Sequence, residues 1–121
     1  MTGAIVASSV VMYDDGVFRI ARIEPPPPGL VLAGEADETG YRALVAALAQ
    51  LRGGNGGEPL TVHLELSGLE FCDAAALHAM IAPAEEGGRR VVLHRPAATL
   101  QALIRIAGWD ELPGVEVVTG Q

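Results

Sequence analysis

The sequence predicts an α/β fold: a mainly parallel β-sheet with an N-terminal antiparallel hairpin and amphipathic helices packed on the sheet. An Asp-Gly turn between two β-prone runs predicts the hairpin. From residue 30 onward strand-like and helix-periodic runs alternate, which favours right-handed crossovers and parallel pairing. The chain has 121 residues, half of them apolar, so we expect a single domain over residues 1–121 with its core at about 10–119.

The first three strands are predicted at residues 10–13, 17–23 and 30–33. Gly16 ends the turn Asp14-Asp15-Gly16 and accepts the positive φ that a tight hairpin requires. The proline tract at 25–28 cannot donate ladder hydrogen bonds, so we interpret it as a connector rather than as a ligand for a proline-binding domain.

A helix is predicted over residues 39–51 and a strand over 60–66. The apolar positions of the helix recur at 3.6-residue spacing: Leu44, Val45, Leu48 and Leu51. The strand alternates Val62, Leu64 and Leu66 with Thr61, His63 and Glu65, so one of its faces is more polar. Between the two, the glycine-rich stretch 53–57 runs from helix to strand, the reverse of a phosphate-binding loop, and we expect a surface loop.

After a turn at 67–72, Asp73 is expected to cap a second helix. Pro83 should kink that helix or change its character. A strand at 90–94, a helix at 96–107 ended by Gly108, and a strand at 115–118 complete the chain. The inward positions predicted for the two helices are Leu77, Met80, Ile81, Ala84, Leu100, Leu103, Ile104 and Ala107. The predicted core is Val62, Leu64, Leu66, Leu77, Ile81, Val91, Leu93, Leu103 and Ile104.

Charge and composition exclude several classes of function. Fifteen acidic against eight basic residues give a net charge of -7, which argues against nucleic-acid and membrane-surface partners. The apolar stretch 43–51 is far below the ~20 residues of a membrane span. The N-terminus lacks a basic region of a signal peptide and a single cysteine builds no disulfide framework, so we expect a cytoplasmic protein.

No residue pattern predicts catalysis. The serines show no nucleophile elbow and the carboxylates no paired-acid arrangement. Cys72 lies between apolar elements and is expected to be a small buried thiol, although a helix N-terminus next to it would activate an exposed one. We therefore predict a non-enzymatic protein without cofactors.

The three histidines do not predict a metal site, because none forms a tight pair in sequence and no cysteine stands at zinc spacing. His63 and His94 fall on neighbouring predicted strands, on the more polar face, which leaves a two-histidine site open. Trp109 follows a helix end and is expected to pack over the core, with an exposed anchor for a partner as the alternative.

The most informative segment is Asp73 followed by three alanines, placed at the start of a helix. The positive end of the helix dipole and the very small side chains make a surface that a partner's backbone can approach closely. A capping aspartate on an alanine-rich helix explains the same residues, and the pattern does not separate the two.

At these residues the chain resembles the STAS family, named for sulfate transporters and anti-sigma factor antagonists, over residues 17–119. Residues 34–37 resemble its G-E-[apolar]-D loop, and 64–71 its strand-to-turn segment, which usually has Asp where Glu65 stands. Residues 71–77 resemble the phosphorylation turn F-[apolar]-D-S-[ST]-G-L, and 89–93 and 103–112 its final strand and helix.

The resemblance implies a STAS-like sheet and a bacterial, cytoplasmic regulator of transcription whose partner is an anti-sigma factor of the histidine-kinase-like ATPase class. It places partner contacts at Gly34, Glu35, Asp37, Asp73, Ala74, Ala75, Ala76 and His78. In regulated antagonists the residue two after the Asp is a phosphorylated Ser or Thr, whereas here it is Ala75, a degenerate phosphosite. The alternative is a ligand-sensing or transport-associated STAS subunit.

Overall fold

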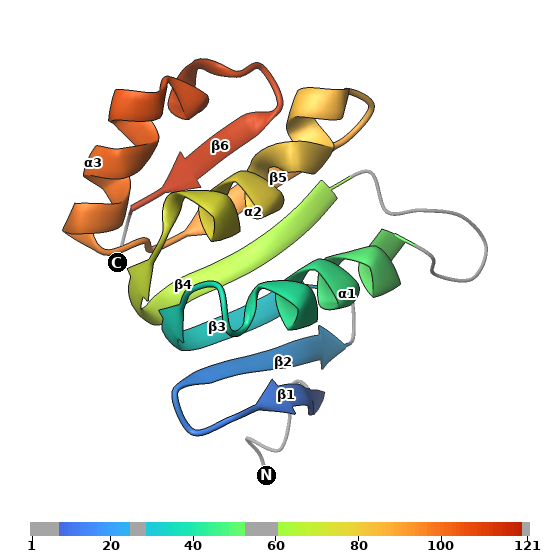
Figure 1. Cartoon of the computed structure of the whole chain (residues 1–121). Helices are drawn as coiled ribbons and strands as arrows, with labels where there is room; N and C mark the ends of the chain where they lie inside the picture. The colour runs from blue at the N-terminus through green and yellow to red at the C-terminus, as the bar shows by residue number, and fades with distance from the viewer. Residues whose placement is uncertain (1–7, 25–28, 53–60, 120–121) are drawn as a thin grey trace, which may run out of the picture.

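All strands of the computed structural model, which describes residues 8–24, 29–52 and 61–119, form one mixed sheet. Its strands follow chain order from β1 to β6; β1–β2 and β2–β3 are antiparallel, and β3 to β6 are parallel (Figure 1). The elements are β1 (Ser8–Asp14), β2 (Phe18–Glu24), β3 (Gly29–Ala36), α1 (Tyr41–Arg52), β4 (Thr61–Cys72), α2 (Ala74–Glu86), β5 (Arg90–His94), α3 (Ala98–Ala107), the short 3₁₀ helix η2 (Trp109–Glu111) and β6 (Val115–Val118). The predicted α/β class and the N-terminal hairpin are confirmed.

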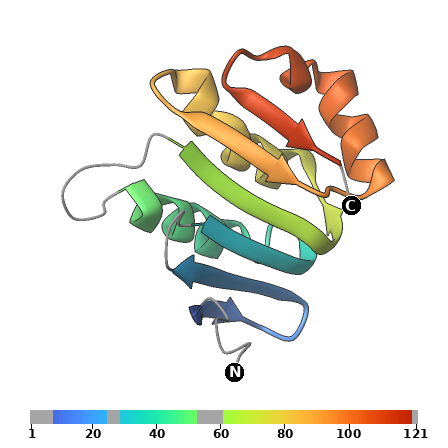
Figure 2. The same ribbon diagram turned by 180° about the vertical axis from the view of Figure 1, so that it is seen from behind.

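The helices cover only one face of the sheet. In Figure 1, α1 and α2 lie in front of the central strands, and α3 flanks the β6 side. Figure 2, turned by 180°, shows the strands in front, with none of the three helices over them. Side chains alternate between these faces along the first half of β4, which points Leu64 toward the helices and His63 and Glu65 toward the uncovered face.

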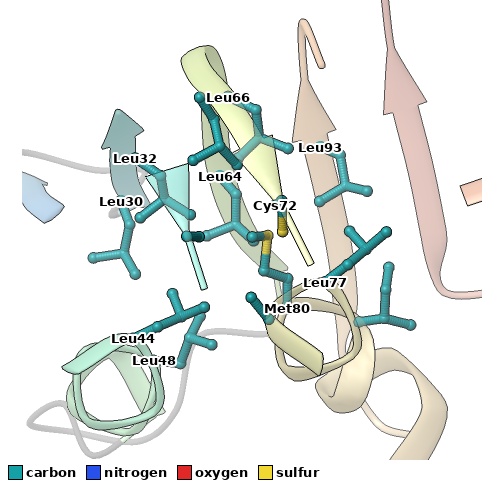
Figure 3. Close-up of a cluster of buried hydrophobic side chains, with 14 of the residues drawn as sticks. Leu30, Leu32, Leu44, Leu48, Leu64, Leu66, Cys72, Leu77, Met80 and Leu93 are labelled. Carbon is teal, nitrogen blue, oxygen red and sulfur yellow. The ribbon is translucent and has the colours of Figure 1, made fainter. Parts of the chain in front are cut away.

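The core lies between the sheet and the helices. Leu30, Leu64 and Leu93 are neighbours in register on three adjacent strands, and each is fully buried. Leucines of α1 and Leu77 and Met80 of α2 close over this row (Figure 3). The predicted core is confirmed except for Leu103, which is only partly buried because α3 lies at the edge of the sheet. Ala107, expected to point inward, is exposed for the same reason.

Two strands are longer than the sequence predicts. Residues 34–36, interpreted as loop, belong to β3, and residues 67–72, interpreted as a turn, belong to β4. The two strands stay paired to their ends, with Ala36 beside Cys72, and register shifts absorb the irregularity after Val31 and Gly34. Pairing between the two parallel strands thus satisfies the backbone N–H and C=O groups of these residues, which the local sequence had placed outside the sheet.

The helices show two further differences. Helix α2 continues past the buried Pro83 to Glu86, so the proline neither ends the helix nor changes its type. Val45, predicted to face inward, is 41% exposed. The proline tract at 25–28 and the glycine-rich stretch at 53–57 lie outside the described residues. In the part of the chain that is described, no helix combines the length and hydropathy needed to cross a membrane.

Candidate functional site

The two segments predicted to contact a partner lie side by side. They lie at the carboxyl ends of the adjacent parallel strands β3 and β4, where Ala36 pairs with Cys72. The backbone N–H of Asp73 donates a hydrogen bond to the carbonyl of Ala36 at 3.0 Å, which ties the start of α2 directly to the end of β3. The predicted meeting of these segments at one edge of the sheet is confirmed.

The first segment carries two carboxylates on a backbone held in place. Gly34 has φ +93°, and the N–H of Glu35 next to it donates to the carbonyl of Val17 at 2.9 Å. Glu35 is exposed. Asp37 accepts a hydrogen bond from the N–H of Thr39 through Oδ1 at 2.9 Å, which forms the turn that leads into α1. These hydrogen bonds fix the backbone positions from which the side chains of Glu35 and Asp37 project.

The second segment is the first turn of α2. Asp73 caps it, with its Oδ1 accepting from the N–H of Ala76 at 2.9 Å, so the capping interpretation is confirmed. Ala74 and Ala75 are exposed, which is what the partner interpretation requires. Ala76 corrects the prediction, because its methyl group is fully buried in the core and cannot contact a partner.

A groove between α1 and α2 adjoins this turn and was missed at the sequence level. It has a volume of about 280 Å³, and Tyr41, Val45, His78 and Ala82 are among the residues that line it. Tyr41 and Val45 are exposed by 37% and 41%. An apolar residue at the edge of the helix's apolar face could have indicated the groove. The sequence pattern alone, however, does not tell which residues of that face remain exposed to solvent.

His78, predicted to contact a partner, is exposed on α2 one turn after Ala74. Its Nε2 lies 2.7 Å from the carboxylate Oε1 of Glu85, and its ring stacks on Trp109 with centroids 5.6 Å apart. Trp109 is partly buried against the core, which confirms the packing interpretation for this residue. These contacts orient the His78 ring at the rim of the groove.

Cys72 is buried beside the site and is suited to packing. Burial raises the pKa of its thiol to about 12, and the neighbouring charge of Asp73 acts in the same direction. At neutral pH the group is therefore a thiol and not the nucleophilic thiolate. The predicted small buried thiol is confirmed.

Two histidines meet on the uncovered face of the sheet, away from the segments described above. Nδ1 of His63 on β4 lies 3.0 Å from Nε2 of His94 on β5. Next to them, Arg95 donates from Nε and Nη2 to the two carboxylate oxygens of Glu65, at 3.1 and 2.6 Å. In the described part of the chain, no three histidine, cysteine or acidic side chains gather as a metal-binding set.

The comparisons with known proteins agree on one fold. Residues 21–118 match a family model described as "Mlab, STAS domain". An anti-sigma factor antagonist from Mycobacterium paratuberculosis is similar in structure, with a TM-score of 0.58, 22% identity and coverage of 96% of this chain and 90% of that chain. The anti-sigma factor antagonist SpoIIAA in its unphosphorylated form gives a TM-score of 0.62 at 19% identity, covering 85% of this chain and 89% of that one. No curated protein matches the sequence significantly.

Proposed function

Since the chain belongs to the STAS domain family, we propose that it is a non-enzymatic, protein-binding regulatory module that acts as an anti-sigma factor antagonist. Its binding site is the strand-end surface, defined as Gly34, Glu35, Asp37, Asp73, Ala74, Ala75 and His78. We further propose that residues 1–121 form a single domain with its core at about 10–119, since one sheet runs through the described part of the chain. We also propose that this domain is cytoplasmic, as the function of an anti-sigma factor antagonist requires.

The observation that carries the proposal is the bond from the Asp73 N–H to the Ala36 carbonyl. It joins an acidic segment and an alanine-rich helix start into one continuous surface on which Glu35, Ala74 and Ala75 are exposed. A helix start with methyl side chains lets another backbone come close, and the carboxylates around it complement a basic patch. The adjoining groove between α1 and α2 offers apolar area for the same partner.

The partner we propose is an anti-sigma factor of the histidine-kinase-like ATPase class. Such a kinase has no acceptor hydroxyl at residue 75, because an alanine stands there. A phosphate at this position would add about -1.5 to -2 charges to an already acidic surface and repel the partner. Binding is therefore constitutive, controlled by the amount of the protein or by a ligand.

The absence of that hydroxyl also favours a second candidate, a ligand-sensing or transport-associated subunit. Affinity purification of the tagged protein, with identification of the retained protein by mass spectrometry, separates the two. Retention of a histidine-kinase-like ATPase supports the first candidate. Retention of a transporter component in its place supports the second and contradicts the first.

Reversing the charge of Asp37 tests the strand-end surface. Asp37→Arg should weaken binding of the purified ATPase by about tenfold or more, because a like charge then faces its basic patch. Asp37→Asn is the matched control for the fold, since an amide oxygen can still accept the hydrogen bond from Thr39. It should bind with intermediate affinity and melt like the wild type, whereas Asp37→Arg loses the acceptor for Thr39 and should melt only slightly lower. Equal Kd values for all three in calorimetry would remove this segment from the interface.

A phosphorylation assay tests the constitutive state. Wild type and Ala75→Ser are incubated with the partner kinase and ATP, and the masses of the intact proteins are measured by mass spectrometry. We expect one added phosphate on Ala75→Ser and none on the wild type, because only the variant has a hydroxyl at the first turn of α2. A phosphate on the wild type, for instance on the exposed Ser67, would contradict constitutive binding.

A further inference from the structure

The uncovered face of the sheet carries a cluster of polar side chains that the proposed function does not use. His63 and Glu65 come from β4, and His94 and Arg95 from β5 and the residue after it. Together with Ile23 they line a concavity of about 330 Å³. Figure 2 shows none of the helices over the strands on this side. The cluster therefore lies on the opposite side of the sheet from α1 and α2.

The two imidazole rings lie at the separation that one shared ion requires. Nδ1 of His63 and Nε2 of His94 are 3.0 Å apart, and the ring centroids are 5.2 Å apart. Two imidazoles on one tetrahedral zinc ion, with Zn–N distances of about 2.0–2.1 Å, have nitrogens about 3.3 Å and ring centres about 5 Å apart. The nitrogen separation is thus close to that of a chelating pair, and reorienting the two half-buried rings would aim both nitrogens at one ion.

The charge next to the two rings is balanced. The nearby Arg95 does not present an unbalanced positive charge, because the Glu65 carboxylate holds its guanidinium by two hydrogen bonds.

The backbone conformation of Arg95 indicates that the side chains around the concavity are held in defined positions. Arg95 has φ +55°, a left-handed conformation that a non-glycine residue adopts at a cost. The arginine side chain starts from this backbone and reaches Glu65 on the neighbouring strand, so the strained residue and the ion pair close one side of the concavity.

We propose that His63 and His94 form a binding site for one divalent late transition-metal ion, with zinc as its typical member, and that water completes the coordination. Neutral imidazole nitrogens suit zinc, copper and nickel rather than magnesium or calcium. The site is independent of the strand-end surface, so its test does not depend on the partner.

Calorimetric titration of the metal-free full chain with ZnCl₂ at about pH 7.5 tests the proposal. We expect saturation at one ion per chain, and a loss of affinity of at least about tenfold in His63→Ala and in His94→Ala, because each removes one of two ligands. His78→Ala is the matched control, since this exposed third histidine pairs with Glu85 elsewhere on the molecule. It should bind zinc like the wild type.

Two measurements on the wild type support the same conclusion without variants. Affinity should fall as the pH is lowered from about 7.5 to about 5.5, because a metal ion binds only deprotonated ligand nitrogens. Excess zinc should raise the Tm, since the ion binds the folded chain. A wild type that does not saturate overturns the proposal. So does zinc binding that persists in the folded double variant His63→Ala/His94→Ala, or that is lost in His78→Ala.

Discussion

Replacing Leu64 by alanine is expected to lower the free energy of unfolding by about 2–5 kcal/mol, out of a total of about 5–15 kcal/mol for a domain of this size. The side chain is fully buried at the centre of the row Leu30, Leu64 and Leu93, between the sheet and the helices, so its removal leaves a cavity in the core (Figure 3). Urea unfolding followed by circular dichroism measures the change.

The matched control for Leu64→Ala is Val45→Ala, at a position that is 41% exposed on α1. It removes methyl groups from a surface groove and should change the free energy of unfolding by less than about 1 kcal/mol. If Leu64→Ala unfolds at the wild-type urea concentration, the assignment of β4 to the centre of the core is wrong.

Gly34→Ala is expected to lower stability by more than about 3 kcal/mol, because backbone strain adds to a lost hydrogen bond. Gly34 has φ +93°, and a Cβ there would lie 2.0 Å from the carbonyl oxygen of Val17. That oxygen accepts the N–H of Glu35, so the clash displaces the acidic segment from β2. Partner binding should weaken along with the Tm.

Gly87→Ala distinguishes the cost of backbone strain from the cost of the steric clash at Gly34. Gly87 has nearly the same φ, +92°, but nothing lies within 4 Å of the position of an added Cβ. It should therefore cost about 1–3 kcal/mol, the price of the backbone conformation alone. The two variants are compared by thermal and urea unfolding. Equal losses of stability would show that the close approach of β2 to Gly34 is not maintained in solution.

Local periodicity predicted the elements well, and long-range pairing explains where it failed. The predicted strands at 90–94 and 115–118 coincide with β5 and β6, because each is an apolar run between clear helix or turn signals. Ser67 and Gly68 resemble a turn in sequence, yet they lie within β4, because Gly68 pairs with Ala33 of β3, more than 30 residues earlier. Pairing with a distant strand cannot be recognised in the local pattern of apolar and polar residues.

The candidate site was predictable in part. The order of the parallel strands was enough to place Asp37 and Asp73 at one edge of the sheet, since the carboxyl ends of parallel strands meet there. The burial of Ala76 could not be predicted, because it depends on how α2 is rotated against the sheet. The contact of His63 with His94 depends on the register of β4 and β5, which alternation alone leaves undetermined.

Strand β4 contributes different residues to the core and to the uncovered face, and its end leads to the strand-end surface. Its inward residues build the core, His63 and Glu65 lie on the open face, and its last residue leads into Asp73. Because side chains alternate with a period of two in the first half of β4, gaining or losing one residue there would exchange the faces and turn a histidine and a glutamate into the hydrophobic interior. Length changes in relatives of this chain should therefore accumulate in the segments between elements, while β4 keeps a constant number of residues.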